Sequence, residues 1–342
     1  MQTSSKQPKY KHLLLIRFSA LGDVAMLPHA VRAFKAAYPD VRVTVLTREF
    51  LKPLFDGLDV DFIFVDFRGK HKGMKGLWQL ASEIKSAGVD AIADTHGVHR
   101  SRILCLMCRL KAWLPSKAIN KGRIEKWFRV GYSKHSAVPL RHTVHRYCTA
   151  IRRLGFDFEN PEPVTKPVLV NPMGEKRGRW IGVAPFSAHA GKTYPEDMCE
   201  ELIEKLSQRF DRVFIHSGGG NEAAFAERME GRFENVTALW GKVKLAEERD
   251  LVSHLDCVVT MDSFVMHLAS LVATPSVSIW GATHPEFGFL GYGYAERGVL
   301  QEDIPCRPCS VYGNKPCKKG DYQCLRAITP DMVVARVEEI LK

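Results

Sequence analysis

The sequence predicts an α/β protein built from two doubly wound parallel sheets. Short apolar runs rich in Val, Ile and Leu alternate with segments of helical periodicity along most of the chain. This alternation is typical of parallel sheets whose two faces are covered by helices. A length of 342 residues is more than a single hydrophobic core usually supports. A proline-rich stretch at 160–172 separates two such series, so we expect two domains, 1–165 and 166–342.

The first series contains four apolar runs, each bounded by polar residues or glycine. These runs predict strands near 12–18, 41–47, 60–66 and 89–94. Apolar residues three and four positions apart predict helices near 23–38, 74–87, 99–112 and 141–154.

The second series repeats this pattern after the proline-rich stretch. Apolar runs predict strands near 179–185, 211–217, 235–238, 256–261 and 276–280. Helical periodicity is found near 196–208, 220–231, 245–253 and 264–272. A closing helix at 328–342 is also expected, and we allow for its packing back on the first domain.

Positive charge is concentrated in one segment. The chain carries a formal charge of +11, whereas Arg100 to Arg153 alone contains fourteen Lys or Arg and one acidic residue. A solvated face would explain this run. Nucleic acid, an anionic membrane surface or a polyanionic substrate would explain it as well. Aromatic residues are interleaved with the charges: Trp113, Trp127, Phe128 and Tyr132.

The apolar stretches are far shorter than a membrane span requires. The first apolar run is broken by Arg17 and leads into Gly22-Asp23 rather than into a small-residue cleavage site. We therefore expect a cytoplasmic protein.

Ligands of doubly wound sheets bind at the carboxyl ends of the strands. The first candidate there is the turn from Ser19 to Asp23, in which Gly22 could allow a tight bend. A single glycine does not make the dinucleotide fingerprint G-x-G-x-x-G. Asp23 is either a cap of the following helix or a general base.

Three loops of the second domain carry further candidates. Ser187 and Lys192 precede a helix and could bind phosphate, although an ordinary polar loop would look the same. Glu222 lies just after three consecutive glycines. These glycines either form a flexible turn or allow the backbone to approach a ligand closely. Asp262 and Ser263 lie at the end of another expected strand, where they could cap the following helix or bind an anion. His267 lies one helical turn after Ser263, on the same side of the helix.

Four cysteines near the end of the chain have the spacing C-x2-C-x7-C-x6-C: Cys306, Cys309, Cys317 and Cys324. In a reducing compartment such a cluster favours a metal over disulfides. We expect a structural role away from the chemistry, with zinc as the candidate ion. The other five cysteines lie in helical or strand patterns typical of a core.

Four segments in order resemble glycosyltransferase family 9, the ADP-heptose:lipopolysaccharide heptosyltransferases. They are IRFSALGDVAMLPHAVRAFKAAYPD, GKTYPEDMCEELIEKL, VVTMDSFVMHLASLVATPSVSIWGATHP and the block CRPC…C…C…ITPDMV. The resemblance implies a GT-B fold of two Rossmann-like domains facing across a cleft. It also implies an inverting transfer from ADP-L-glycero-D-manno-heptose that needs no metal or other cofactor.

The resemblance also implies roles for single residues. Asp23 takes the place of the family's proposed base, with Ser19 and Gly22 on the acceptor side. The residues implied to bind the donor are Ser187, Lys192, Glu222, Asp262, Ser263 and His267. Phe264 stands where the family often has glycine. The implied partners are a nucleotide-sugar donor, an acidic glycolipid acceptor and the cytoplasmic face of the inner membrane, rather than nucleic acid.

Other functions remain open on the sequence. A nucleotide-sugar epimerase shares the GT-B architecture and needs no acceptor, and a transferase could use another nucleotide sugar. A non-enzymatic binder of membranes or nucleic acid would use the basic segment, but it would leave the polar strand ends unexplained.

Overall fold

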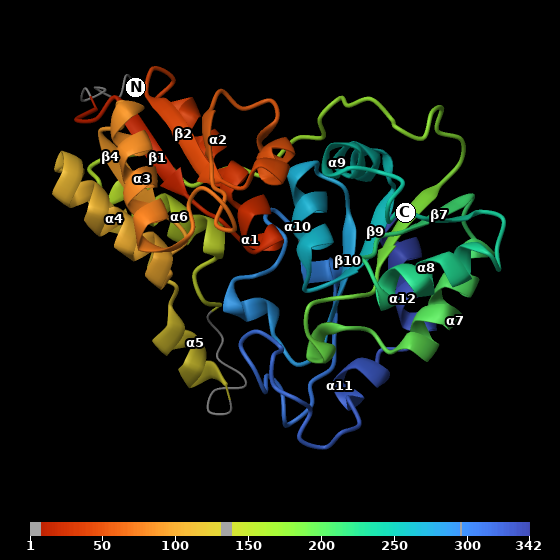
Figure 1. Cartoon of the computed structure of the whole chain (residues 1–342). Coiled ribbons are helices and arrows are strands. Elements are labelled where there is room, and N and C mark those ends of the chain that lie inside the picture. The colour runs from red at the N-terminus through yellow and green to blue at the C-terminus, as the bar shows by residue number, and fades with distance from the viewer. Residues whose placement is uncertain (1–7, 131–138, 295) are drawn as a thin grey trace, which may run out of the picture. The chain divides into compact units, whose positions relative to one another are not determined.

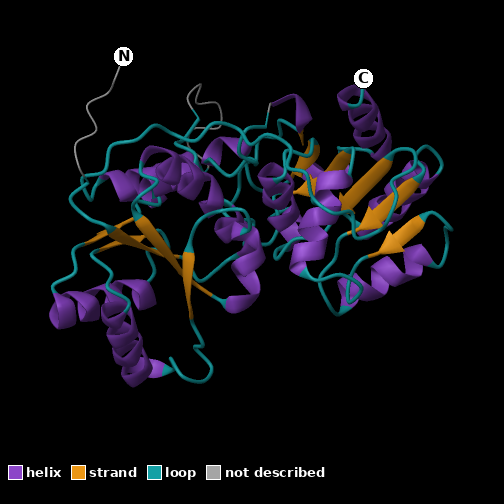
Figure 2. Cartoon of the chain, turned by 90° about the horizontal axis from the view of Figure 1, so that it is seen from above, coloured by secondary structure: helices purple, strands orange, loops and turns teal. Residues whose placement is uncertain are grey.

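The computed structural model describes residues 8–130, 139–294 and 296–342, and it divides into two compact units (Figure 1). Unit 1 is formed by 1–121 and 143–162, and unit 2 by 122–142 and 163–342. In each unit helices cover both faces of a parallel sheet (Figure 2). The predicted fold class is confirmed.

Unit 1 contains a five-stranded sheet of order β3-β2-β1-β4-β5, in which all paired strands are parallel. Its strands are β1 (His12–Ile16), β2 (Arg42–Thr47), β3 (Asp61–Phe64), β4 (Ala91–Asp94) and β5 (Ser116–Ala118). Its helices are α1 (Leu21–Ala25), α2 (Leu27–Ala37), α3 (Gly73–Ser86), α4 (His99–Ala112) and α6 (Thr143–Arg152), with a 3-10 helix at Glu49–Phe55.

Every residue of β1 is buried, because this strand is central and helices lie on both sides of it. Leu14 and Ile16 point to the face covered by α3 and α4, where they share one core with Leu80 and Leu104. Side chains alternate along a strand, so Leu13 and Leu15 face the opposite side.

Unit 2 contains a six-stranded parallel sheet of order β11-β10-β9-β6-β7-β8. Its strands are β6 (Trp180–Ala184), β7 (Arg212–Ile215), β8 (Val236–Ala238), β9 (Cys257–Met261), β10 (Ser276–Trp280) and β11 (Val299–Gln301). Its α-helices are α5 (Arg123–Arg129), α7 (Glu196–Ser207), α8 (Asn221–Glu230), α9 (Leu245–His254), α10 (Phe264–Leu271), α11 (Gln323–Arg326) and α12 (Pro330–Ile340). Its 3-10 helices are Ala190–Lys192, Pro285–Phe287 and Glu296–Gly298.

The structure differs from the sequence prediction in several elements. The helix expected at 23–38 is two helices, α1 and α2, which meet at Met26, and Pro28 lies in the first turn of the second. Proline has no N–H group to continue a helix and is favoured where one begins. The short elements β5, α5, β11 and α11 were not predicted, because three to seven residues give too little periodicity.

The chain crosses between the units near the predicted boundary at 165, but helix α5, which precedes that boundary, belongs to unit 2. Lys126 lies 3.9 Å from the ring centre of Phe289, and Arg129 pairs with Glu286 at 3.6 Å. These long-range contacts attach α5 to unit 2. They cannot be read from the local pattern.

The last helix, α12, packs on α7, β9 and β10. Its buried residues Val333, Val334 and Val337 belong to the core of unit 2. The apolar face that we allowed to pack on the first domain is therefore buried inside unit 2. No helix within the described ranges is long and apolar enough to cross a membrane.

Candidate functional sites

The central strands of both sheets carry the polar residues. In unit 1 the strand order reverses between β1 and β4, and in unit 2 between β6 and β9. Loops that leave such a pair of neighbouring strands diverge to opposite faces and leave a crevice at the carboxyl edge, where ligands of these folds bind. Ligands are therefore expected at the loops after β1 and β4 and at those after β6 and β9.

Asp23 lies in the first turn of α1, where its carboxylate forms an ion pair with the guanidinium of Arg17. The Arg17 side chain is 3% exposed and that of Asp23 is 35% exposed. The residue that caps α1 is Ala20, so Asp23 is not the N-cap. The alternative explanation was that Asp23 caps the helix. The structure does not support this role, because Asp23 is not the N-cap residue.

Arg17 is held by groups from three directions. Its Nη1 donates to the carbonyl of Thr95 at 2.6 Å, and its guanidinium lies 5.7 Å from the ring centre of Tyr147. The Tyr147 hydroxyl in turn donates to the carbonyl of Asp23 at 2.9 Å. Burial acts to lower the pKa of Arg17, but attraction to Asp23 outweighs it and the pKa is raised. The pair is thus a fixed arrangement with one reachable carboxylate.

The neighbours of Asp23 lie as follows. Ser19 is half-buried in the loop before α1. Gly22 lies inside α1, and its carbonyl accepts a hydrogen bond from the N–H of Met26 at 3.2 Å. The prediction of a tight bend at Gly22 is therefore wrong, because the helix already begins at Leu21.

His96 is a candidate that sequence reasoning missed. It is the second residue after β4 and is 8% exposed, and its Nδ1 accepts the backbone N–H of Phe18 at 3.0 Å. Burial, followed by the charge of Arg17, lowers the pKa of His96 to about 3. The imidazole is therefore neutral, with its proton on Nε2. The motif Asp94-Thr95-His96 after an expected strand is the signal that could have found it.

Asp94 fixes the loop that carries His96. One carboxylate oxygen accepts the N–H groups of His96 and Gly97 at 3.0 and 2.8 Å, and the other accepts the Ser101 hydroxyl at 2.8 Å. A buried carboxylate with three donors is fully satisfied. Asp94 thus has a positioning role.

In unit 2, side chains from three neighbouring strand ends meet. Lys192 follows β6, Asp262 follows β9 and Thr283 follows β10. The ammonium of Lys192 donates to Oδ2 of Asp262 at 3.1 Å, and the hydroxyl of Thr283 donates to the same oxygen at 3.1 Å. Both charged side chains are mostly buried. Thr283 was not among the predicted residues.

Ser263 and His267 lie on the same loop–helix junction as Asp262. Ser263 is the N-cap residue of α10, and its hydroxyl lies 3.2 Å from that of Thr260. His267 is in the second turn of α10 and is buried. Phe264, half-buried, is the first residue of the helix.

Ser187 and Glu222 bond within their own loops. The N–H of Ser187 donates to the hydroxyl of Thr193 at 3.2 Å, which donates back to the Ser187 carbonyl. The carboxylate of Glu222 accepts the N–H of Gly218 at 2.7 Å. Ser187 thus shares the loop after β6 with Lys192, but among the described hydrogen bonds none joins the side chain of Ser187 or of Glu222 to the Lys192–Asp262 pair.

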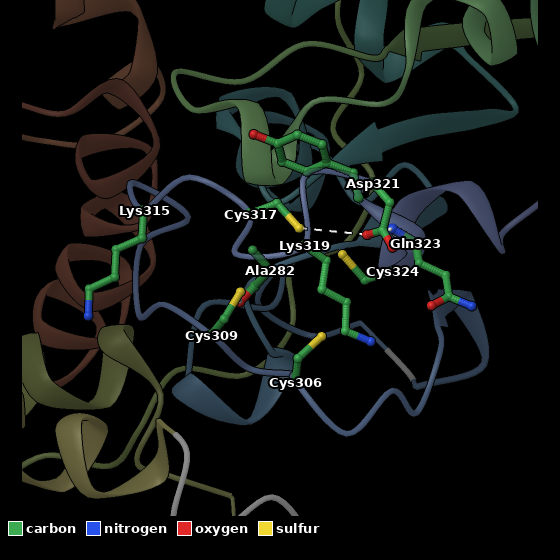
Figure 3. A pocket seen from close by; sticks show the side chains of 10 residues that line it. Ala282, Cys306, Cys309, Lys315, Cys317, Lys319, Asp321, Gln323 and Cys324 are labelled. Atoms are coloured by element: carbon green, nitrogen blue, oxygen red, sulfur yellow. Dashed lines mark hydrogen bonds between the residues drawn. The ribbon is translucent and has the colours of Figure 1, made fainter.

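The four clustered cysteines line one small cavity of about 20 Å³ (Figure 3). Burial acts to raise the pKa of Cys317, but backbone N–H groups of Tyr322, Lys319, Gly320 and Asp321 outweigh it and the pKa is lowered. Burial raises the pKa of Cys324 to about 11. In the described part of the chain no three His, Cys, Asp or Glu are arranged to hold a metal ion.

The loop with these cysteines contacts Lys192. A side chain on Gly313 would collide with the stem of Lys192, and the Gly313 backbone has a φ of +71°. The N–H groups of Cys309 and Ser310 donate to the carbonyl of Ala282, next to Thr283, at 3.2 and 3.3 Å. We expected this cluster to lie away from the chemistry, but its loop borders the Lys192–Asp262 pair.

The basic segment from Arg100 to Arg153 is divided between the two units. Trp113, Trp127 and Phe128 are exposed, and Tyr132 lies outside the described residues. The five cysteines expected in the core, which are Cys105, Cys108, Cys148, Cys199 and Cys257, are all buried thiols.

Comparison with known proteins gives one consistent result. A family model described as glycosyltransferase family 9 (heptosyltransferase) matches residues 78–319. The lipooligosaccharide heptosyltransferase 2 of Haemophilus influenzae is 33% identical over an alignment of 368 positions, gaps included, which covers 96% of this chain and 99% of that protein.

Two solved structures have the same fold. The glycosyl transferase family 9 protein from Veillonella parvula aligns with a TM-score of 0.74 at 18% identity, covering 99% of both chains. The Escherichia coli heptosyltransferase WaaC, solved with ADP-2-deoxy-2-fluoro heptose, aligns with a TM-score of 0.64 at 19% identity, covering 96% of this chain and 99% of that one.

Proposed function

The chain belongs to glycosyltransferase family 9, and we propose that it transfers heptose from ADP-L-glycero-D-manno-heptose to the inner core of lipopolysaccharide or a related glycolipid. The observation that carries the proposal is the partly exposed carboxylate of Asp23, held by the buried Arg17 at the switch point of the first sheet. The relative from Haemophilus influenzae, similar over nearly its whole length, supports the choice of heptose and of a lipid-linked acceptor.

Asp23 is the general base of this proposal. The ion pair with Arg17 requires the carboxylate in its ionised form, which is the form that can accept a proton. As the acceptor oxygen bonds to the anomeric carbon, its proton passes to Asp23. The bond from that carbon to the diphosphate oxygen breaks, and ADP leaves with the electron pair. One base and one leaving group on opposite sides give inversion.

Unit 2 binds the donor in this proposal. Lys192 supplies positive charge to the diphosphate, and Ser263 and His267 lie at the neighbouring end of β9. A carboxylate repels phosphate, so we assign Asp262 the role of positioning Lys192 and Thr283 rather than contacting the donor. Glu222 is assigned to the ribose, and Ser187 to the loop beside the phosphates. Such donors stabilise the leaving charge and leave no step that needs a metal.

The acceptor side belongs to unit 1, with Ser19 and Gly22 next to Asp23. An acidic glycolipid and the cytoplasmic face of the inner membrane fit the positive charge of Arg100 to Arg153. This charge supports a cytoplasmic enzyme that attaches peripherally to the membrane.

We also propose a structural zinc at Cys306, Cys309, Cys317 and Cys324. Four thiols at one cavity are a donor set that zinc prefers. The backbone N–H groups around Cys317 favour its thiolate, the form that binds metal. Their present arrangement does not by itself form a metal site, so no step of the reaction is assigned to the ion.

A nucleotide-sugar epimerase is the alternative enzyme of the same architecture. It would consume ADP-heptose without an acceptor, whereas the proposed transferase needs one. Release of ADP from the donor alone, and from the donor with a purified heptose-deficient glycolipid, separates the two. Release only in the presence of the glycolipid supports the transferase, and equal release without it would contradict the transferase.

A further inference from the structure

Helix α4 of unit 1 has two apolar faces, and one of them is exposed. Leu104 and Cys108 are fully buried in the core. Leu106, Leu110 and Trp113 are 57%, 67% and 87% exposed. Residues four and three positions apart lie on one side of a helix, so these three form a single stripe that ends at the helix C-cap, Trp113.

Helix α3 packs beside α4 and carries a further exposed aromatic side chain (Figure 1). Trp78 of α3 is 46% exposed, and Nζ of Lys111 lies 4.4 Å from its ring centre. Lys111 also donates to the Trp78 carbonyl at 3.3 Å. The surface formed by the three exposed apolar side chains of α4 is called the α4 face: Leu106, Leu110 and Trp113.

The α4 face has positive charge along one side. Helix α4 contains no acidic residue, and its Arg102 and Arg109 are exposed. Arg102 precedes Leu106 by four positions and Arg109 precedes Trp113 by four, so both arginines lie on the side of the stripe. The acidic residue of α3, Glu83, is already paired with Lys70 at 2.8 Å.

We propose that the α4 face docks onto a lipid bilayer with anionic headgroups. Apolar side chains flanked by arginines, with a tryptophan at the helix end, are what an interfacial helix uses to enter the headgroup region. A second copy of the chain fits less well, because a symmetric contact would place the arginines of the two copies against one another. Nucleic acid would use the arginines but would leave the leucines without a partner.

The inference deepens the proposed function, since it rests on an acceptor that lies in a membrane. Its test is co-sedimentation with vesicles of phosphatidylethanolamine containing phosphatidylglycerol, beside vesicles of phosphatidylcholine alone. The test variant is Leu106→Ser/Leu110→Ser/Trp113→Ala. The matched control is Val168→Ser/Val170→Ser, which removes two equally exposed apolar side chains from unit 2. Arg102→Gln/Arg109→Gln tests the charge.

We expect the wild type and the matched control to bind the anionic vesicles. The affinity of the triple variant for these vesicles should be at least about tenfold lower than that of the wild type. The arginine variant should also bind less, and its difference from the wild type should be largest at low salt. All the replaced side chains are exposed, so the melting temperature should not change. Unchanged vesicle binding by the triple variant would overturn the proposal. The proposal would also be overturned if the wild type were a dimer and the triple variant a monomer. Binding of duplex DNA or RNA by the wild type but not by the triple variant would overturn it as well.

Transfer to a delipidated, water-soluble acceptor separates this proposal from the function itself. The triple variant should keep the wild-type rate on that acceptor and lose rate only on acceptor embedded in vesicles. An equal loss of rate on both acceptors would contradict a docking role. A wild-type protein that is inactive on both would contradict the proposed function, while the vesicle binding would stand by itself.

Discussion

Arg17 and Asp23 form an ion pair in which the cation is almost completely buried and the anion is reachable from solvent. The two residues lie on either side of the turn from β1 into α1. The arginine therefore fixes the position of the carboxylate, while the carboxylate keeps an open side for a substrate.

Replacing Asp23 by Asn tests its role as the base. The amide keeps the size of the side chain but cannot accept the proton, so turnover should fall about a hundredfold or more. Arg17 loses its anion, which should lower the free energy of unfolding by about 1–3 kcal/mol because water can partly replace it. Transfer rate and melting temperature are the two measurements.

The control for this substitution is Asp59→Asn, which removes a carboxylate paired with Lys35 at 2.7 Å on the surface. It should leave the rate unchanged. A folded Asp23→Asn protein with the wild-type rate would remove Asp23 from the catalytic step.

Replacing Lys192 by Ala tests the donor site. A lost charge-assisted contact costs about 1.5–3 kcal/mol, which corresponds to ADP binding about 10- to 150-fold weaker. The uncovered carboxylate of Asp262 would repel the diphosphate and act in the same direction. Calorimetric titration of ADP measures the change.

Lys176→Ala is the matched control, because Lys176 also forms a lysine–aspartate pair, with Asp256 at 2.8 Å. Asp256 precedes β9, whereas Asp262 follows it, so this pair lies at the opposite edge of the sheet. Its loss should not change ADP affinity. Equal affinity of wild type and Lys192→Ala would exclude Lys192 from the donor site.

His96 predicts a dependence of stability on pH. Its pKa of about 3 in the folded protein lies below the ordinary value of 6.5. The unfolded chain therefore binds the extra proton between these two values, and folding loses free energy as the pH falls below about 6.5. The loss should approach about 1.4 kcal/mol per pH unit relative to His96→Asn. Urea unfolding of both proteins at pH 7, 6 and 5 measures this difference, and parallel pH profiles would contradict it.

Elemental analysis tests the cysteine cavity. Protein purified without a metal-binding tag should contain about one zinc per chain, since a four-cysteine site binds one ion. Cys306→Ser/Cys309→Ser should lose it. Cys105→Ala/Cys108→Ala should retain it, because this pair has the same spacing but lies in the core of unit 1. Wild-type protein without metal would show that the four residues are thiols only.

The sequence allowed both sheets and most of the candidate loops to be predicted. Buried strands give uninterrupted apolar runs, and the residues after them lie at one known edge of the sheet, which is why Asp23, Lys192 and Asp262 could be named. His96 follows the same rule after β4 and could have been included. The pairing of Arg17 with Asp23 was not predicted, although an arginine directly after a buried run is a signal that a partner must exist.

Other features depend on contacts between residues distant in sequence. Helix α5 joins unit 2 through Phe289 and Glu286, more than a hundred residues further along the chain. The cysteine loop reaches Lys192 because Gly313 adopts a left-handed backbone and has no side chain to collide with the lysine stem. Neither relationship leaves a local pattern in the sequence.

The proposed reaction is an inverting transfer of heptose to a glycolipid. The most direct measurement is analysis of the product formed from ADP-heptose and a heptose-deficient glycolipid acceptor, by mass spectrometry and by NMR of the new anomeric centre. We expect the glycolipid to gain one heptose whose anomeric configuration is opposite to that of the donor. An acceptor that stays unmodified while the donor is consumed, or a product that keeps the donor's configuration, would contradict an inverting heptosyl transfer by this protein.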